Sequence, residues 1–428
     1  MKIVAQTGSD ADNKRKALAE TNCALFASRG STVHMSAGAR MLTTVRRHGL
    51  TPHRLAWDFA SIALASIVAD FAELRAAKSP DGWTRELELV VPVSDPDRWN
   101  GLAPTLVDAM KFLTTDRWSF TFVPGTVPYR RPSRRQRIYP DADCVALLSG
   151  GMDSLIGGID LVRSGIAPYF VTQTVNADGP TQDRFARDLG SPWQVTLNHC
   201  AFVDGKREPS QRARSLMFIA HGVLVATALE AYTSGSTVDL FVNENGYISI
   251  NPPLTPMRVG SLSTRTAHPR FLGLVQDLLD GAGIAVQLSN PYKFKTKGEM
   301  LVECADQDLL KVLAPLSTSC GRFGRDGSHC GRCLPCQVRR AAFLRWGQPD
   351  KTSLYRYNDL GKADEDHSGF DDVRSVAYAL AVVDTQGLDN WLGSTLASVP
   401  IDERDDTKQM LERGVDELRT LHGRLHVT

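Results

Sequence analysis

The residues best suited to chemistry form a short polar turn, Ser149-Gly-Gly-Met-Asp-Ser154, which follows the apolar run 144–148. Its two glycines allow a tight turn and a close approach of the backbone to an anion. The free amides at the start of the helix expected over 154–164 would point at that anion. Ser149 and Ser154 add hydroxyl donors, and Asp153 could help to hold a divalent cation that accompanies phosphates. The turn therefore predicts a phosphate-binding site.

A second cluster with a defined chemistry lies further along the chain. Four thiols follow the spacing C-x9-C-x2-C-x2-C: Cys320, Cys330, Cys333 and Cys336. Each two-residue spacing allows a tight knuckle that brings neighbouring sulfurs onto one ion, which suits tetrahedral zinc. A disulfide framework is the alternative, and the adjacent His329 could replace one cysteine. We expect zinc, because disulfides are rare in a reducing cytosol.

The elements that must position these groups alternate between strands and helices. Apolar runs typical of strands are separated by helical stretches, and they occur at 144–148, 169–175, 193–197, 238–242 and 284–288. This rhythm predicts an α/β fold with a parallel sheet covered by helices on both faces. Ligands of such sheets bind beyond the carboxyl ends of the strands, where the turn 149–154 lies. We expect 172–176 and Asn243–Asn245 to face the same crevice.

Further candidates lie near helix starts. Arg212 and Arg214 fall in the first turn of the helix expected over 211–231, where a bound anion would offset their repulsion from the helix dipole. Before the helix 269–281 lie four more candidates for an anionic ligand, Thr264, Arg265, Thr266 and His268. Lys297, in the first turn of a helix near 296–305, could pair with a departing phosphate group.

Taken together, these motifs resemble those of a known family. The turn lacks the lysine of a Walker A loop and resembles the PP-loop of ATP pyrophosphatases. Combined with Ser317-x-x-Cys320 and Cys330-Gly-x-Cys-x-x-Cys336, it resembles the 7-cyano-7-deazaguanine synthase (QueC) family over roughly 142–346. Arg212–Ala220 and Asn290–Met300 resemble two further segments of that family. The resemblance implies an adenine nucleotide alpha hydrolase-like fold.

The resemblance also implies an activity and a set of cofactors. Members of that family adenylate the carboxylate of 7-carboxy-7-deazaguanine and pass it to ammonia, giving an amide and, with a second ATP, the nitrile. The implied cofactors are ATP, Mg2+ and Zn2+, and the implied catalytic residues are Ser149, Asp153, Ser154 and Lys297. The implied ATP-binding residues are Leu148, Ser149, Gly150, Gly151, Met152, Asp153, Ser154, Leu155 and Thr174.

This chain departs from the family pattern around the expected substrate pocket. Gln173–Asn176 stands in place of the family's Tyr-Gly-Gln, and its Gly-Tyr-Pro-Asp-Cys-Arg segment has no clean counterpart. The remaining substrate candidates are Arg212, Arg214, Asn243, Glu244, Asn245, Thr264, Arg265, Thr266 and His268. A changed pocket beside a retained ATP site predicts the same activation step with a different acceptor.

Regions outside the resemblance predict added domains. Residues 1–123 are expected to form an α+β accessory domain, with helices over 53–77 and 99–113, and 347–428 to form a helical extension. Between the accessory domain and the core domain 141–346, a linker over 124–140 carries five arginines between Arg130 and Arg137. We expect a solvated linker, with RNA or an acidic partner as the alternative.

The layout resembles the long QueC-like proteins of bacterial antiphage defence operons (QatC type), which implies amide transfer to a protein amine. The leading hypothesis is therefore an adenylating amide ligase with a deazaguanine-type carboxylate as substrate and a protein partner or acceptor. Alternatives are synthesis of the nitrile from ammonia, a tRNA thiolase or lysidine-type PP-loop enzyme, and, from another class, a nucleotide-sensing scaffold.

The composition of the chain limits the classes of protein to which it can belong. The chain has 428 residues, 42% hydrophobic and 23% charged, with a formal net charge of +1, which argues against a broad nucleic-acid surface. We expect no apolar run of the length, about 18 residues, needed to cross a bilayer. The start, Met1-Lys-Ile-Val-Ala-Gln, is too short and polar for a secretory signal. The sequence thus predicts a cytoplasmic enzyme that does not bind membranes.

Overall fold

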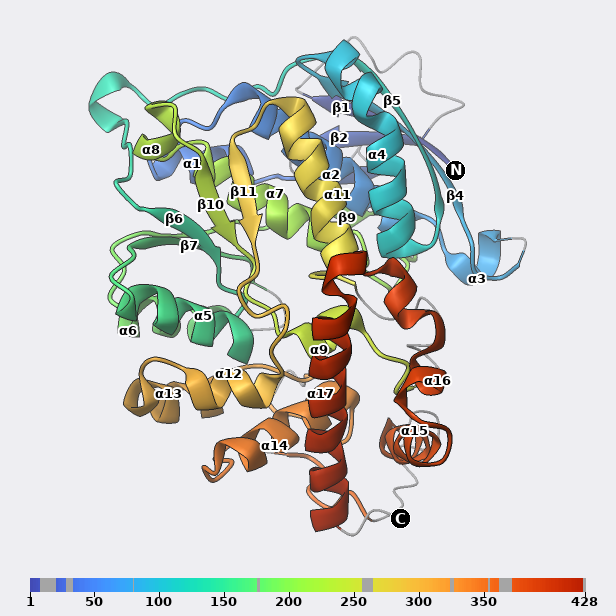
Figure 1. The fold of residues 1–428 in the computed structure, drawn as a ribbon. Coiled ribbons are helices and arrows are strands. Elements are labelled where there is room, and N and C mark those ends of the chain that lie inside the picture. Colours follow the sequence, from blue (N-terminus) through green and yellow to red (C-terminus); the bar gives the residue numbers. More distant parts are fainter. Residues whose placement is uncertain are drawn as a thin grey trace.

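The computed structural model of the protein describes residues 1–7, 21–27, 34–79, 81–174, 178–255, 265–323, 327–352, 355–361 and 372–425. Figure 1 shows two β-sheets with helices around them, and a mainly helical C-terminal region drawn in red. Thr264, one of the predicted substrate residues, lies outside the described residues.

The five strands predicted for the central sheet are all present. They are β6 (Cys144–Leu147), β7 (Pro168–Thr172), β8 (Gln194–Thr196), β10 (Val238–Phe241) and β11 (Val286–Ser289). The strand order is β11-β10-β6-β7-β8, and all neighbours are parallel. The carboxyl ends of the strands therefore share one edge, and the turn 149–154 follows the central strand β6 at that edge.

Helices cover both faces of this sheet, as predicted. They are α5 (Met152–Arg163) and α6 (Gly179–Asp188) on one face, and α7 (Arg214–Ala226) and α11 (Pro269–Ala282) on the other. Along β6, Val145 and Leu147 pack in the hydrophobic cluster of α7 and α11, whereas Ala146 and Leu148 pack in that of α5 and α6. This division follows from the alternation of side chains along a strand.

The N-terminal region is an α/β unit, not the predicted α+β domain. Its strands are β1 (Lys2–Thr7), β2 (Thr21–Leu25), β3 (Met35–Ala37), β4 (Glu86–Val93) and β5 (Arg117–Pro124). They are mutually parallel in the order β5-β4-β1-β2-β3. The sequence prediction missed β1, β2 and β3, and it did not anticipate that β4 and β5 pair in parallel. A short strand from the core region, β9 (Phe202–Val203), completes the sheet by pairing antiparallel with β3.

The long apolar helix α2 (Arg54–Ala72) lies between this sheet and the core. It contacts β4 on one side and α7 on the other, and every residue from Leu55 to Phe71 is buried. Contrary to the expectation from the sequence, α2 is long and apolar enough to cross a membrane, but 94% of its apolar window is buried inside the protein. A position between two layers requires a helix that is apolar on all sides. α2 is therefore a buried helix between the two layers.

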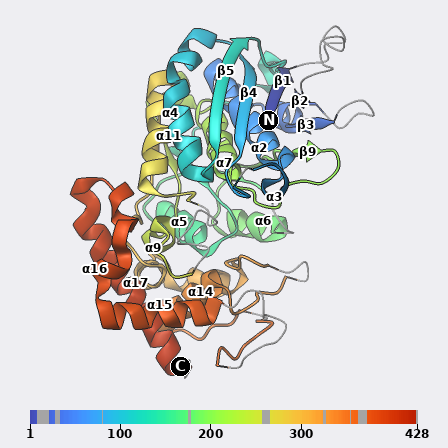
Figure 2. The same cartoon turned by 90° about the vertical axis from the view of Figure 1, so that its right-hand side faces the viewer.

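The predicted domain division remains a prediction, but the two sheets share one hydrophobic core. That core includes Phe59 on α2, Val145 on β6 and Val223 on α7. In addition, α4 (Pro96–Thr114) packs beside α11, as both views show (Figures 1 and 2). Within the expected linker, the backbone N–H of Ile138 donates to the carbonyl oxygen of Gly49 at 3.0 Å.

The remaining described helices complete the fold. Short ones are α1 (Met41–Arg47), α3 (Arg75–Lys78), α8 (Glu230–Thr233), α9 (Gly246–Ile250), α12 (Lys297–Glu303), α13 (Gln307–Leu313) and α16 (Leu388–Leu392). Longer ones are α14 (Leu334–Trp346), α15 (Asp372–Gln386) and α17 (Arg404–Arg424). The predicted helical C-terminal region is therefore confirmed, and it packs with α9 and α14 in a hydrophobic cluster of its own.

A buried ionic network joins the N-terminal region to the start of α7. The carboxylate of Asp116 forms ion pairs with the guanidinium groups of Arg75 and Arg85, each at 2.7 Å. Arg85 also forms an ion pair with the carboxylate of Asp70 at 2.6 Å. The second carboxylate oxygen of Asp70 accepts the backbone N–H of Ala213 at 3.0 Å. The side chains of Asp70, Arg85 and Asp116 are fully buried. The network therefore fixes where α7 begins.

We expect Asp116→Ala to lower the free energy of unfolding by about 3–5 kcal/mol, because it leaves two buried guanidinium groups without their shared carboxylate. The matched control is Glu86→Ala, which removes an ion pair to Arg117 whose side chains are 70–74% exposed. That loss should be at most about 1 kcal/mol. Denaturant unfolding of both variants measures the difference, and equal losses would contradict the structural role given to the network.

Candidate functional site

The turn after β6 has the geometry of an anion cradle. Gly150 has φ of +80°, which a side chain would strain, and Gly151 caps α5. The hydroxyl of Ser154 donates to the carbonyl oxygen of Gly151 at 3.0 Å and accepts the backbone N–H of Ser149 at 3.2 Å. These bonds close the turn on itself, so that the first amides of α5 face the space beyond the sheet edge.

Asp153 joins three separate segments of the chain. Its Oδ2 accepts the side-chain amide of Asn245 at 2.7 Å and the backbone N–H of Asn245 at 3.3 Å. Its Oδ1 pairs with the ammonium group of Lys297. The side chains of Asp153 and Lys297 are each only 7% exposed, so water screens their attraction weakly. The pair therefore places a fixed cation beside the turn.

Helix capping positions both partners of Asp153. Asn245 caps α9, because its side-chain oxygen accepts the N–H of Ile248 at 3.0 Å. Thr296 caps α12 in a capping box with Glu299, which places Lys297 at the first position of that helix. The two helix starts are tied together, since the N–H of Gly246 donates to the carbonyl oxygen of Lys295 at 2.9 Å.

Glu244 adds a second carboxyl group to the site. Burial, reinforced by the negative charge of Asp153, raises the pKa of Glu244 from its ordinary value of 4.5 to about 8, although Lys297 opposes the shift. Near neutral pH this group is therefore largely protonated. When ionised, Glu244 and Asp153 would offer the oxygen donors that Mg2+ prefers.

This shift predicts a pH dependence of stability. Because the folded-state pKa of Glu244 is raised, its contribution to stability is complete below pH 4.5 and is lost as the pH rises through about 8. We expect the melting temperature to fall more steeply between pH 5 and 8 in the wild type than in Glu244→Gln, measured without divalent cations. Parallel profiles for the two proteins would show that Glu244 does not titrate in this range.

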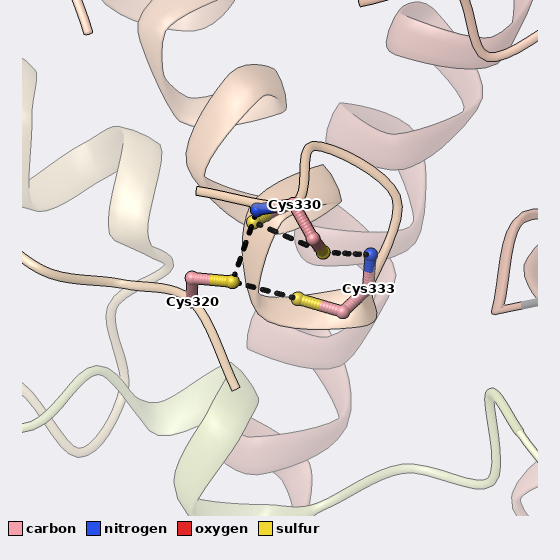
Figure 3. A group of neighbouring side chains, drawn as sticks. Cys320, Cys330 and Cys333 are labelled. Carbon is pink, nitrogen blue, oxygen red and sulfur yellow. Dashed lines mark hydrogen bonds between the residues drawn. The ribbon is translucent and has the colours of Figure 1, made fainter. Parts of the chain in front are cut away.

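The four predicted cysteines converge on one point. Their sulfur atoms all lie within 4.8 Å of one another, and Figure 3 shows Cys320, Cys330 and Cys333 with their sulfurs turned together. The Cys320–Cys333 and Cys330–Cys336 sulfur distances are 3.8 and 3.9 Å. A disulfide bond is only about 2.05 Å long. Four thiolates about 2.3 Å from one tetrahedral ion would lie about 3.8 Å apart, so the cluster fits zinc.

His329, the alternative ligand, does not belong to the cluster. Its Nε2 accepts the backbone N–H of Ser319 at 3.2 Å, and its ring packs against Phe323 and Tyr355. Backbone amides approach the sulfurs instead: the N–H of Cys330 donates to Cys320 Sγ at 3.2 Å. Such bonds stabilise thiolate ligands.

The segment around the cysteine cluster, here called the knuckle, forms one wall of a cavity of about 270 Å3 next to the turn 149–154. The knuckle contributes Thr318, Ser319, Cys320, Gly321 and Pro335 to this wall. The N–H of Thr318 donates to the carbonyl oxygen of Gly150 at 2.9 Å, which joins the knuckle to the turn directly. The described lining consists of Ser149, Gly151, Met152, Asp153, Ser154, Glu244, Ile248, Lys297, Thr318, Ser319, Cys320, Gly321 and Pro335. The cavity thus unites the two motifs with the predicted residues Glu244 and Lys297.

Neither of the two arginines predicted as substrate ligands appears in the described lining of the cavity. Arg212 precedes α7, is 2% exposed, and stacks over the ring of Trp83 while it donates to the carbonyl oxygen of Thr114 at 3.0 Å. It therefore belongs to the contact with the N-terminal region. Arg214 begins α7 and faces the carboxylate of Asp178, which opposes the lowering of the Arg214 pKa by burial.

The described candidates before α11, Arg265, Thr266 and His268, also lie outside the described lining of the cavity. Arg265 lies over the ring of Phe112 on α4, and its guanidinium donates to that residue's carbonyl oxygen at 3.3 Å. The hydroxyls of Thr266 and Ser215 are 2.8 Å apart. His268 caps α11 and lies 3.2 Å from the hydroxyl of Ser398. These residues thus connect the start of α11 to α4, to α7 and to the C-terminal region.

Two other candidates, Asn243 and Thr174, are also absent from the described lining of the cavity. Asn243 is buried against α5, where a Cβ on Gly157 would lie 2.2 Å from its side chain, so glycine is required there. The exposed Thr174 donates its backbone N–H to the side chain of Asn198 at 3.0 Å. Their predicted contacts with ATP or substrate remain predictions.

Sequence reasoning missed two buried residues that support the site. Gln182 on α6 donates to the carbonyl oxygens of Ser149 and Gln173, each at 3.1 Å, and thereby ties the turn to the end of β7. Arg339 on α14 donates to the hydroxyl of Ser317 at 2.7 Å and fixes the approach to Cys320. No motif marks either residue, because each acts through contacts that only the fold creates.

Comparison with known proteins places these observations in context. No protein-family model matches the chain. The 7-cyano-7-deazaguanine synthase of Ectopseudomonas mendocina (strain ymp) is 27% identical over 244 residues, which is 50% of this chain and 99% of that protein. The 7-cyano-7-deazaguanine synthase of Rhizorhabdus wittichii is 27% identical over 236 residues, which is 49% of this chain and 94% of that protein. The similarity predicted from the two motifs is thus confirmed for half of the chain, and the resemblance to antiphage proteins stays a prediction.

Proposed function

We propose that this chain is an ATP-dependent ligase with a PP-loop fold that adenylates a 7-carboxy-7-deazaguanine-type carboxylate and transfers the acyl group to an amine. The acceptor that we propose is an amine of a partner protein, in an antiphage defence setting in the cytoplasm. The observation that carries the proposal is one cavity lined by the turn 149–154, the ammonium of Lys297 and the cysteine knuckle. The similarity to two proteins named 7-cyano-7-deazaguanine synthase supports the substrate class.

In the proposed reaction, a carboxylate oxygen of the acid attacks the α-phosphorus of ATP. The bond from that phosphorus to the bridging oxygen breaks, and pyrophosphate leaves with the electron pair. The amides and hydroxyls of the turn would hold the β- and γ-phosphates, and Lys297 would stabilise the charge that develops on pyrophosphate. In the second step the amine nitrogen attacks the acyl carbon, AMP leaves, and the nitrogen loses a proton.

Two metals have distinct proposed roles. Mg2+ held by Asp153, with Glu244 when ionised, would neutralise phosphate charge while this chain's own amides orient the phosphates. Zinc in the four-cysteine cluster would hold the knuckle, and with it the cavity wall from Thr318 to Gly321, in place.

The choice of acceptor rests on the unmatched half of the chain. Each relative is covered almost entirely, so about half of this chain has no counterpart in them. Additional surface suits an acceptor larger than ammonia. The second candidate is synthesis of the nitrile from ammonia, which the names of the relatives favour. Exposed arginines such as Arg130 and Arg134 also leave RNA as a proposed partner.

The acceptor is tested with the purified protein, ATP, Mg2+ and 7-carboxy-7-deazaguanine. In one arm ammonia is added, and in the other the proteins encoded beside this chain. We expect AMP in both arms and an increase in the intact mass of a partner protein only in the second. Nitrile formation with ammonia, together with unmodified partners, would support the second candidate instead.

A further inference from the structure

We infer that the C-terminal helix α17 is a positioning element of the candidate ATP site, and that Glu417 on this helix fixes the location of Lys297. This inference rests on the proposed function, since it assigns a role in the same site. It gives the C-terminal extension a part in the chemistry in addition to any part in docking. Figure 1 shows α17 running past α9 and α14, and Figure 2 agrees in placing α17 beside both.

Glu417 binds the residues on either side of Lys297. Its carboxylate accepts the hydroxyl of Thr296, the cap of α12, and a hydrogen bond from the backbone of Gly298. The side chain of Glu417 is buried, with an exposed fraction of 7%. Glu417 and Thr296 lie 121 positions apart in the sequence, so only the fold brings them together. A carboxylate from α17 therefore occupies the amino terminus of α12, where the helix dipole favours negative charge. These contacts hold the backbone on both sides of Lys297.

Two arginines complete the contact between α17 and α12. Arg345 on α14 lies 3.4 Å from Glu417 and 3.3 Å from Glu299, and Arg413 on α17 lies 2.6 Å from Glu299. Two buried carboxyl groups are thus balanced by two guanidinium groups. Because Glu299 belongs to the capping box of Thr296, the same ions also hold the first turn of α12.

Helix α17 also supports the other partner of Asp153. A Cβ on Gly414 would lie 2.1 Å from the ring of Tyr247, which follows Asn245 by two residues on α9. Likewise, a Cβ on Gly246 would lie 2.9 Å from the side chain of Met410. The helix therefore packs closely on both segments that hold Asp153. Since interiors transmit displacement through packed groups, movement of α17 would shift Lys297 and Asn245 together.

The backbone of Gly298 is packed so closely against its neighbours that a side chain there would collide with them. A Cβ there would lie 2.5 Å from both Glu417 Oε1 and the side chain of Arg345. Burial, reinforced by Glu299, raises the pKa of Glu417 to about 7, and Arg345 and Thr296 oppose the shift. Both the neutral and the charged carboxyl can accept the two hydrogen bonds. Glutamine at this position keeps the acceptor oxygen and is therefore the conservative variant.

The direct test measures the protection of Lys297 itself. The intact protein is treated with an amine-acetylating reagent, and peptide mass spectrometry compares the labelling rate of Lys297 with that of Lys311, a half-exposed lysine on α13. In Glu417→Ala we expect Lys297 to be labelled at least about fivefold faster, because it leaves its buried pairing with Asp153. Glu417→Gln should restore protection. The control is Glu412→Ala, an exposed glutamate on the same helix, which should behave as wild type.

A second arm measures ATP–pyrophosphate exchange dependent on the acid. In Glu417→Ala we expect kcat to fall about 10- to 100-fold, because displacement of a catalytic group by about 1 Å costs this much. The KM for ATP should change much less. Unchanged labelling of Lys297 in Glu417→Ala would overturn the inference, whatever the activity. Absence of exchange in the wild type would count against the proposed function alone, since labelling still decides the inference. If Glu417→Ala does not fold, the same two measurements are made on Glu417→Asp, whose shorter side chain draws the carboxylate away from Thr296.

Discussion

Lys297→Met is expected to lower the rate of acid-dependent ATP–pyrophosphate exchange by about 10²–10³-fold, which is the usual loss when one preorganised group that stabilises developing charge is removed. Lys297 is the cation of the buried pair with Asp153 and lines the cavity at the turn. Without it, the carboxylate of Asp153 would lose its buried ammonium partner, and the departing pyrophosphate would lose the cation proposed to stabilise its charge. The loss should therefore appear mainly in kcat.

The control for this variant is Lys311→Met. Lys311 pairs with Asp308 at the surface, and its side chain is 45% exposed, so we expect unchanged exchange. The double variant Asp153→Asn with Lys297→Met should be no less active than the less active of the two single variants, because the two residues act as one unit. Losses that multiply would show that Asp153 and Lys297 act separately. Thermal unfolding of each variant separates loss of activity from loss of fold.

The second large effect is expected from loss of the metal cluster. Cys336→Ser removes a fully buried ligand, so we expect bound zinc to fall from one equivalent per chain to a small fraction. Structural zinc sites contribute about 10–16 kcal/mol of binding free energy in small domains, so the knuckle should lose its order. Because Thr318 binds Gly150 directly, the cavity wall should be lost and exchange should fall at least about 100-fold.

Two measurements test this prediction in the Cys336→Ser protein. Elemental analysis gives its zinc content, and limited proteolysis reports cleavage between 314 and 336. Cys200→Ser is the control, because Cys200 is exposed and lies outside the cluster. It should retain zinc, resistance to proteolysis and exchange. Full exchange activity in a zinc-free Cys336→Ser protein would contradict the role given to the knuckle as a wall of the cavity.

The strands and helices of the core could be predicted because local pattern determined them. The strand β6 and the turn after it are fully specified by neighbouring residues, and the order of apolar runs implied a parallel sheet. Asn245 was predicted at the crevice because it follows β10 at the carboxyl edge, and the structure places it against Asp153. By contrast, no strand was predicted over 2–7 or 35–37, where β1 and β3 form, so the parallel nature of the N-terminal sheet was missed.

Positions set by tertiary packing could not be predicted. Arg212 looked like a helix-start arginine free to bind an anion, yet Trp83 and Thr114 surround it in the fold. No motif marked Glu417 within the expected helical extension, and only the fold brings it to Thr296. The spacing of the cysteines predicted their convergence, because ligand spacing constrains geometry locally whereas an isolated charge does not.

The central claim, that the turn 149–154 binds ATP for activation of a carboxylate, is tested most directly by exchange of labelled pyrophosphate into ATP without any acceptor. The intact protein, with Mg2+ and zinc, is assayed with and without 7-carboxy-7-deazaguanine, beside Asp153→Ala. We predict exchange that requires the acid and is absent in Asp153→Ala. Binding of ATP without any acid-dependent exchange, or equal exchange in Asp153→Ala, would contradict the claim.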